Sequence, residues 1–452
     1  MSKKPTKLIG LHIDEFDSLV SQGEEIHVQP ARLIPFYKPG DEMALTSIFL
    51  SAIRLISEFR NQVFKAIGLS KSKYLRIYTE VEFVLFDRLR VDGMILVLRG
   101  NKIIDALLLE VKNKSVDLKQ DQIQAYVGIA KEYAIPNMLT ISNQFVSFPT
   151  QSPIQVKVPK HVSTYHLSWS FLLTIAHILL AENDNNIADE DQVEIMREVV
   201  DYFESPISGI LGFSQMKPGW VELTQKANTG SSLKLSDPCV EETVSSWLQE
   251  ERDMALILSR ELGLLVKSGK AKFKNNLSDR DKFERKELIS SCTLSSTLSV
   301  EGAASTIDIV AHFDRKNVSM SCSLTPPADK KTRGQISWLR NQLKQSEKKN
   351  SELFEAMLPE LMIEINLKFV KEPLRIPFKE LDDAVDQIAA REIKSFGILY
   401  LKYLGRKFES RKGVVSIIET MLLTYYQGIV QHLKKWEKPA PQIKKLSELE
   451  NI

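Results

Sequence analysis

Residues 79 to 126 decide the fold of the first part of the chain, and they read TEVEFVLFDRLRVDGMILVLRGNKIIDALLLEVKNKSVDLKQDQIQAY. Two apolar runs within this stretch, at 89–98 and 103–112, are separated by a polar turn that contains Gly100 and Asn101. This pattern predicts a β-hairpin. Acidic residues lie inside both runs, where an unpaired carboxylate is costly to bury. The stretch therefore predicts a hairpin whose buried carboxylates have a role.

The second strand ends with Glu110, Val111 and Lys112. Alternate side chains of a strand share a face, so Glu110 and Lys112 point the same way and Val111 points to the other side. If Asp92 of the first strand lies opposite them, two carboxylates and the Val111 carbonyl can bind Mg²⁺ through oxygen. Lys112 is then placed to orient or deprotonate an attacking water, or to stabilise charge on a phosphate.

Asp92 followed by Glu110, Val111 and Lys112 resembles the motif of the PD-(D/E)XK nuclease superfamily, with Val91 in place of the proline. The following helix carries Gln122 and Tyr126, a Gln-x-x-x-Tyr pattern similar to the exonuclease-like branch of that superfamily. The resemblance covers residues 43–167. It implies Asp92, Glu110 and Lys112 as catalytic residues, Mg²⁺ or Mn²⁺ as cofactor, and Gln122 and Tyr126 as substrate-binding residues.

Each of these features has a structural alternative. Glu110 and Lys112 also fit an ion pair on a solvated edge strand, and Gln122 and Tyr126 also fit an ordinary helix face. A third metal-binding acid is expected at Glu80, which lies with Glu82 and Tyr78 on one face of the preceding strand, while Leu75, Ile77, Val81 and Phe83 fill the other face. Glu58 on the first helix is a reserve candidate, because the apolar stripe of that helix faces away from it.

Periodicity predicts the order of elements around the hairpin. We expect a helix at 43–67, strands at 74–86, 89–98 and 102–112, a helix at 117–134 and a strand at 137–142. This order matches the core of the restriction-endonuclease-like fold, an α/β domain in which helices flank a mixed sheet. The remaining ranges are interpreted as an irregular or short-stranded leader at 1–42, a helical extension at 168–223 and a linker at 224–237.

The sequence of residues 238–452 predicts a separate α+β domain with an antiparallel sheet and long helices. Three alternating strands follow a basic stretch at 267–286, and two long helices are expected at 380–404 and 414–436. The segment DKKTRGQISWLRNQLKQ, residues 329–345, predicts a basic helix that carries Trp338. This helix fits either a nucleic-acid or partner-binding surface, or a helix whose Trp338 and leucines cover the sheet.

The composition is that of an ordinary globular protein, with a net charge of +2, 43% apolar residues and three scattered cysteines. These cysteines are too few for a disulfide framework, which favours a reducing, cytoplasmic location. The start of the chain lacks the pattern of a signal peptide, and the apolar run at 168–181 is too short for a membrane span, so no membrane is expected.

The sequence therefore predicts a Mg-dependent deoxyribonuclease. By analogy alone, its role is in genome defence or repair. DNA is the expected partner, a homodimer would suit the cutting of two strands, and residues 238–452 are a candidate surface for a protein partner. The alternative is a catalytically silent nuclease-fold binding module in a stress-related or defence protein assembly.

Overall fold

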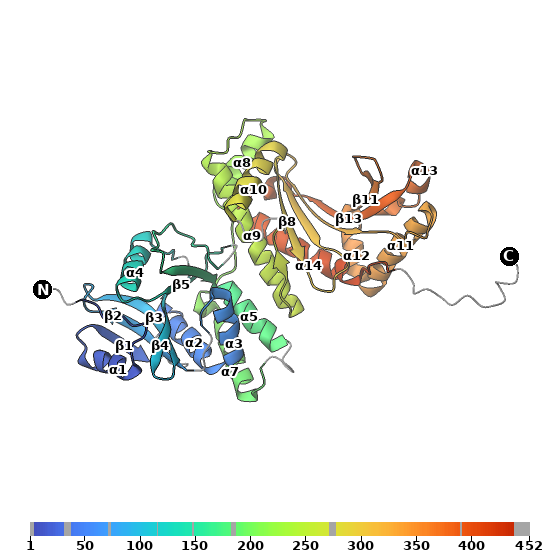
Figure 1. Ribbon diagram of the computed structural model, residues 1–452. Helices are drawn as coiled ribbons and strands as arrows, with labels where there is room; N and C mark the ends of the chain where they lie inside the picture. The colour runs from blue at the N-terminus through green and yellow to red at the C-terminus, as the bar shows by residue number, and fades with distance from the viewer. Residues whose placement is uncertain are drawn as a thin grey trace, which may run out of the picture. The chain divides into compact units, whose positions relative to one another are not determined.

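A computed structural model of the chain describes residues 4–30, 38–70, 74–114, 116–146, 149–181, 187–270, 277–388 and 391–437. The chain forms two compact units, the first from Met1–Met216 with Val244–Val266 and the second from Lys217–Thr243 with Lys267–Ile452. The first unit holds a mixed six-stranded sheet and the second an antiparallel seven-stranded sheet, each with helices (Figure 1). The predicted fold class, α/β followed by α+β, is confirmed.

The first sheet has its strands in chain order, with the predicted hairpin at its centre. Neighbours from β1 to β4 are antiparallel, whereas β5 and β6 continue parallel to β4. Its strands are β1 (Ile26–Pro30), β2 (Leu75–Phe83), β3 (Leu89–Arg99), β4 (Lys102–Val111), β5 (Asn137–Ser142) and β6 (Ser163–Ser168). The hairpin strands therefore have neighbours on both sides, which explains why they are apolar along most of their length.

Helices cover both faces of this sheet, and each face has its own core (Figure 1). One face, with Leu96 and Leu108, packs against α1 (Ile13–Gln22) and α4 (Gln120–Glu132). The other face, with Ile95 and Leu107, packs against α2 (Glu42–Leu55), α3 (Ser57–Ile67), α5 (Trp169–Ala181) and α7 (Glu190–Glu204). The middle of the hairpin is thus shielded from water, and only the strand ends reach the edges of the sheet.

At the start of the chain one prediction was wrong, and another, the short-stranded leader, missed a helix. The single helix expected at 43–67 is two helices, because Ile56 adopts an extended conformation (φ −110°, ψ 104°) between α2 and α3. No glycine or proline marks this break in the sequence. The leader expected at 1–42 contains α1, and its β1 pairs antiparallel with β2, so these residues complete the first sheet.

The regular alternation expected for β2 was also wrong. Ile77 belongs to the core under α2 and α3, but Val81 and Phe83 belong to the core under α1 and α4. The switch occurs at Glu80, whose φ of 50° is unusual for a residue with a side chain. The pairing of β1 with β2 shifts at the same place, which identifies a β-bulge. A bulge re-aims the side chains that follow it.

The second sheet runs in the order β12-β11-β13-β10-β9-β8-β7, and all neighbouring strands are antiparallel. Buried and less buried side chains alternate along β9 and β11, as in a sheet with one face in the core. The strands are β7 (Lys267–Ser268), β8 (Thr293–Ser299), β9 (Ile307–His312), β10 (Asn317–Leu324), β11 (Leu361–Leu367), β12 (Leu374–Pro377) and β13 (Ile393–Tyr403).

One helix, α9, contributes residues to both units. The helix α9 begins in the second unit, and its residues from Val244 onward belong to the first. The range 224–237, expected as a linker, holds the end of α8 and the turns that follow it. The helices are α8 (Gly219–Asn228), α9 (Pro238–Leu262), α10 (Leu277–Ser291), α11 (Thr332–Lys349), α12 (Ser351–Met357), α13 (Ala384–Ile388) and α14 (Arg411–Gly428).

The long helix predicted at 380–404 was wrong. The structure has the short α13 there, followed by β13, which pairs with β10 on one side and β11 on the other. A strand buried between two neighbours is apolar on both faces, so its sequence looks like that of a buried helix. The apolar run around Phe396 and Ile398 was misread for this reason.

One helix among the described residues, Arg411–His432, has the length and hydropathy of a membrane span. Of its most apolar window, 56% is buried. Ile418 and Leu422 of α14 are fully buried, and the Tyr425 hydroxyl donates a 2.6 Å hydrogen bond to the Ile398 carbonyl of β13. These contacts are those of a helix that packs on its sheet.

Candidate active site

The structure brings Asp92, Glu110, Val111 and Lys112 together at one end of the central hairpin. Gly93 pairs with Leu109, so Asp92 and Glu110 occupy the next positions on β3 and β4. The Val111 amide donates a 2.7 Å hydrogen bond to Asp92 Oδ2. Lys112 Nζ lies 2.8 Å from Glu110 Oε1 and 3.0 Å from the Val111 carbonyl oxygen. The juxtaposition expected from the sequence is therefore present.

Burial dominates the electrostatics of the two acids. It raises the pKa of Asp92 above its usual range, against the opposing charge of Lys112. For Glu110, burial and the nearby Asp92 carboxylate raise the pKa to about 8, although Lys112 lowers it. Burial is the largest single influence on Lys112 and lowers its pKa, but the charges and hydrogen bonds of Glu110, Asp92 and Glu42 together outweigh burial and leave the pKa raised. In this arrangement the lysine is a cation, and burial together with Asp92 favours the protonated form of Glu110.

Gln122 of α4 reaches Glu110, and Tyr126 of the same helix is linked to the site through Gln122. Gln122 Nε2 donates hydrogen bonds to Glu110 Oε1 at 2.8 Å and to the Tyr126 hydroxyl at 2.9 Å. The Tyr126 hydroxyl donates to the Arg90 carbonyl of β3 at 2.7 Å. Burial, with the charge of Glu110 second, raises the pKa of Tyr126 to about 12. The helix is thus tied to both hairpin strands at the site.

Of the candidates for a third acid, Glu80 is the one that interacts with Asp92. Burial raises the pKa of Glu80, Arg90 lowers it and Asp92 raises it further. Its side chain is 5% exposed and lies 3.1 Å from Arg90 Nε. Glu82 instead pairs with Arg88 at 2.9 Å. Glu58 accepts a 2.8 Å hydrogen bond from its neighbour Ser57 and makes no described contact with the site.

Three residues at the site were missed by the sequence analysis. Glu42, at the start of α2, accepts a 2.9 Å hydrogen bond from Lys112 Nζ. Trp169 Nε1 donates to the Lys112 carbonyl at 2.9 Å and fixes the backbone there. Arg90 pairs with Glu80. An acid in the first turn of a helix is explained by its favourable interaction with the helix dipole. The sequence around Glu42 therefore does not indicate that this residue contacts the site.

The oxygen atoms of the site fit a hard divalent cation. Within the described residues, no group of three or more His, Cys, Asp and Glu side chains is arranged to hold a metal ion. Two carboxylates, from Asp92 and Glu110, and the Val111 carbonyl are nevertheless adjacent. Glu110 Oε2 is buried and accepts no hydrogen bond from an N–H group of the described residues, but Glu110 shares a proton with the adjacent Asp92 carboxyl group. Once that proton is released, the two adjacent carboxylates are suitable ligands for Mg²⁺ or Mn²⁺.

No protein-family model matches the chain, and neither a curated protein nor a solved structure matches it. The likeness to the PD-(D/E)XK superfamily therefore rests on the motif residues and on the order of elements around them. Because one fold can carry many functions, a function for this chain has to come from the geometry of its side chains.

Proposed function

We propose that the first unit is a Mg²⁺- or Mn²⁺-dependent nuclease that hydrolyses phosphodiester bonds in DNA. The observation that carries the proposal is the meeting of Asp92, Glu110, Lys112 and the Val111 carbonyl at the hairpin end, where two buried carboxyl groups lie side by side. Burying two carboxylates side by side is costly, and a bound cation would offset that cost. By analogy, such an enzyme belongs to defence against invading DNA or to repair.

In this proposal Asp92, Glu110 and the Val111 carbonyl would hold the cation, and Glu80 would join them directly or through a water molecule. A bound Mg²⁺ would supply positive charge to the phosphate and favour ionisation of the attacking water. Lys112, whose pKa is raised, donates hydrogen bonds from Nζ to a phosphate oxygen or to that water. Its charge favours this role over that of a general base.

Gln122 and Tyr126 position the acids and the substrate. The Gln122 amide orients Glu110 through the 2.8 Å hydrogen bond, and Tyr126 anchors the helix to β3. Arg90 is 62% exposed in its side chain, so it can turn from Glu80 towards a DNA phosphate. These side chains come from β3 and α4, the two elements that border the acids.

A second candidate function follows from the salt bridges of Lys112. Its Nζ lies 2.8 Å from Glu110 and 2.9 Å from Glu42, so the ammonium is already paired without a ligand. This observation favours a catalytically silent nuclease fold that serves as a binding module in a defence or stress-related protein assembly. Such a module binds its partner without metal.

Cleavage of linear and circular plasmid DNA distinguishes the two functions. Purified full-length protein is incubated with Mg²⁺, Mn²⁺ or a chelator, beside Asp92→Ala and Lys112→Ala. The nuclease proposal expects metal-dependent cleavage by the wild type and none by either variant. Glu82→Ala, which removes a more exposed acid from the neighbouring strand, is the matched control and is expected to cleave. A wild type that is inert with both metals, or variants that cleave as well as the wild type, would refute the proposal.

A further inference from the structure

One flank of α11 in the second unit is polar and carries a half-buried tryptophan. Leu339 and Leu343 are fully buried, so they are the side chains that attach the helix to the core. One flank of the helix, beside this buried side, bears residues at alternating spacings of four and three, beginning at the N-cap residue, and we call this set the α11 stripe: Lys331, Gln335, Trp338, Gln342, Gln345 and Lys349. The stripe is about 27 Å long at the rise of an α-helix.

A basic pocket of about 630 Å³ lies at the N-terminal end of the stripe. Its only acidic lining residue is Glu392, which is 2.5 Å from Lys368. Its cationic lining residues are all exposed, and they are Lys330, Lys331, Lys368, Arg391 and Lys394. Among the residues that the structure describes, Lys330, Lys331 and Lys394 have no salt-bridge partner. Such an excess of unpaired cations around one hollow favours a ligand with several phosphates.

A second pocket of about 660 Å³ lies along the same helix and is lined by Trp338, Asn341 and Gln345. Within the described part of the unit, these three side chains have no hydrogen-bond partner. Gln342 holds the wall of this pocket, because its amide accepts from the Lys434 backbone at 3.1 Å and donates back at 3.4 Å. Lys349 and Lys434 supply positive charge beside it. A half-exposed indole with free amides next to lysines is suited to a nucleobase and its phosphates.

We propose that the α11 stripe binds a single strand of nucleic acid, with an unpaired base stacked on Trp338 and backbone phosphates in the basic pocket and at Lys349. The inference rests on the proposed function, because it takes the strand to be part of the nuclease substrate. A single strand fits better than a duplex, since only an unpaired base can offer both its ring face and its pairing edge to one pocket. A stripe of about 27 Å matches about eight stacked nucleotides.

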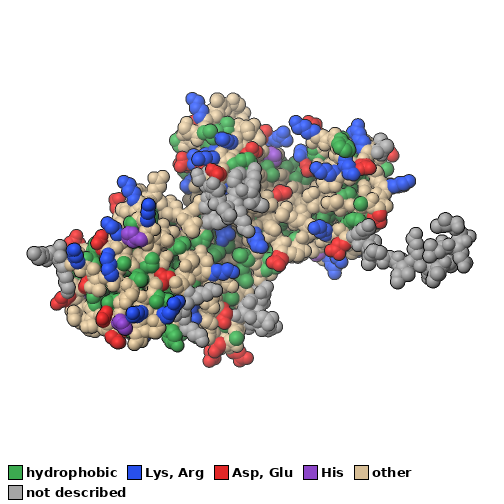
Figure 2. Space-filling model, viewed as in Figure 1, with side chains coloured by type: hydrophobic (Ala, Val, Ile, Leu, Met, Phe, Trp, Pro, Cys, Tyr) green, Lys and Arg blue, Asp and Glu red, His purple; other side chains and the backbone are tan. Residues whose placement is uncertain are grey.

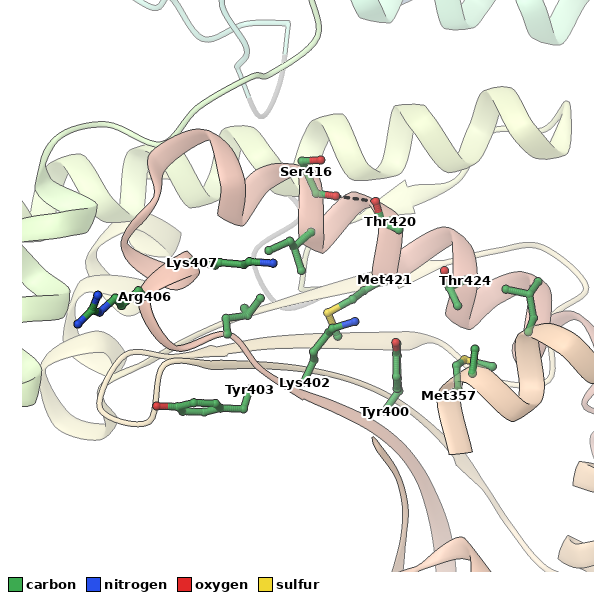
Figure 3. Close-up of a pocket in the computed structure, with 14 residues that line it drawn as sticks. Met357, Tyr400, Lys402, Tyr403, Arg406, Lys407, Ser416, Thr420, Met421 and Thr424 are labelled. Carbon is green, nitrogen blue, oxygen red and sulfur yellow. Dashed lines mark hydrogen bonds between the residues drawn. The ribbon is translucent and has the colours of Figure 1, made fainter. Parts of the chain in front are cut away.

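Another pocket of the same unit provides a comparison. This pocket, of about 600 Å³, lies between the end of β13 and α14 (Figure 3). Lys402 and Lys407 point into it, whereas Arg406 points away. Lys402 Nζ is also 3.8 Å from Glu360. The pocket at β13 and α14 therefore has fewer free cations than the basic pocket. Tyr403, an exposed residue that lines it, is a matched aromatic control for Trp338.

Fluorescence anisotropy with a labelled 20-nucleotide DNA strand tests the proposal. Full-length protein is titrated in chelator, so that no cleavage occurs, at several KCl concentrations. Trp338→Ala is expected to weaken binding about fivefold to 150-fold, the loss typical of one stacked base, whereas Trp338→Phe keeps most of the affinity. Lys331→Ala with Lys394→Ala is expected to lower the slope of log affinity against log salt by about 1.4, or 0.7 for each phosphate contact. Tyr403→Ala is expected to bind as the wild type does.

The outcomes separate this inference from the nuclease proposal. A Trp338→Ala protein that binds within twofold of the wild type, or tighter binding of the matching duplex than of the strand, would overturn the inference. If that Trp338→Ala protein still cleaves DNA, the nuclease proposal stands although the inference fails. Conversely, Trp338-dependent binding by a protein that never cleaves DNA would show that the α11 stripe binds a strand that is not a nuclease substrate, and it would refute the proposed function.

Discussion

Glu110→Gln is predicted to stabilise the protein at alkaline pH while it removes a metal ligand. In the folded chain, burial and Asp92 raise the pKa of Glu110 from its usual 4.5 to about 8. Between these two values the folded state keeps a proton that the unfolded state has released. The free energy of unfolding therefore falls as the pH rises. Glutamine has the same shape and no charge, so the variant lacks this dependence.

The magnitude follows from the size of the pKa change. Each pH unit in which only the folded state holds the proton lowers the free energy of unfolding by about 1.4 kcal/mol. From pH 5 to pH 8 the wild type should lose on the order of 3 kcal/mol relative to Glu110→Gln. Lys112 does not alter this difference, because its raised pKa keeps it protonated throughout this range.

Urea denaturation of both proteins at pH 5, 6, 7 and 8, in chelator, measures the effect. The difference between the two free energies of unfolding cancels the titration of the shared groups that do not interact with Glu110, whereas Asp92, which does interact with it, contributes to the difference. Glu82→Gln is the control for loss of a carboxylate from this sheet, and because it retains Glu110 it should follow the wild-type pH dependence. A difference between wild type and Glu110→Gln that stays constant from pH 5 to pH 8 would refute the reasoning.

Three further predictions follow from the same contacts. Lys112→Met should lower the rate of DNA cleavage at saturating Mg²⁺ by about 10²-fold or more, the usual effect of losing one charge-stabilising donor, and a rate within threefold of wild type would contradict that role. Gly93→Ala should destabilise the protein by about 1–3 kcal/mol in urea melts, because an added Cβ would lie 2.8 Å from Leu50 Cδ1. Gly128→Ala, whose Cβ would meet nothing within 4 Å, is its control and should not destabilise. Finally, Mn²⁺ should raise the melting temperature more at pH 8 than at pH 5, since it competes with the Glu110 proton, and an equal rise at both would count against the site.

The hairpin was predictable because its signal is local. Glu110, Val111 and Lys112 are consecutive, and the turn that brings Asp92 back beside them is only a few residues long. Gln122 and Tyr126 follow shortly, one helical turn apart. The alternation of apolar residues, the residue types in the turn and the short spacing along the chain therefore determine these positions without reference to the rest of the chain.

The parts that could not be predicted depend on contacts between distant segments. Glu42 is 70 residues from Lys112, and only the packing of α2 against the sheet brings them together. The bulge at Glu80 follows from the way β1 adds to β2, and a positive φ at a glutamate has no sequence signature. Residues 393–403 form a strand because two other strands flank them. In each case tertiary contacts override the local pattern.

Side-chain charge gave little help with the second unit. Basic and acidic side chains are interspersed on the visible faces of both units (Figure 2), as a net charge of +2 suggests. The α11 stripe became distinct only when the structure showed that Leu339 and Leu343 face the core and Trp338 does not. The sequence left both interpretations of that helix open.

Titration of Mn²⁺ into the full-length protein by calorimetry at pH 7 tests the central claim most directly, namely that Asp92 and Glu110 hold a divalent cation. We predict binding to the wild type with release of a proton, because Glu110 is protonated below about pH 8 in the free protein. Asp92→Asn and Glu110→Gln should each weaken this binding at least about tenfold. Wild-type protein that binds no Mn²⁺, or variants that bind it equally well, would contradict the claim.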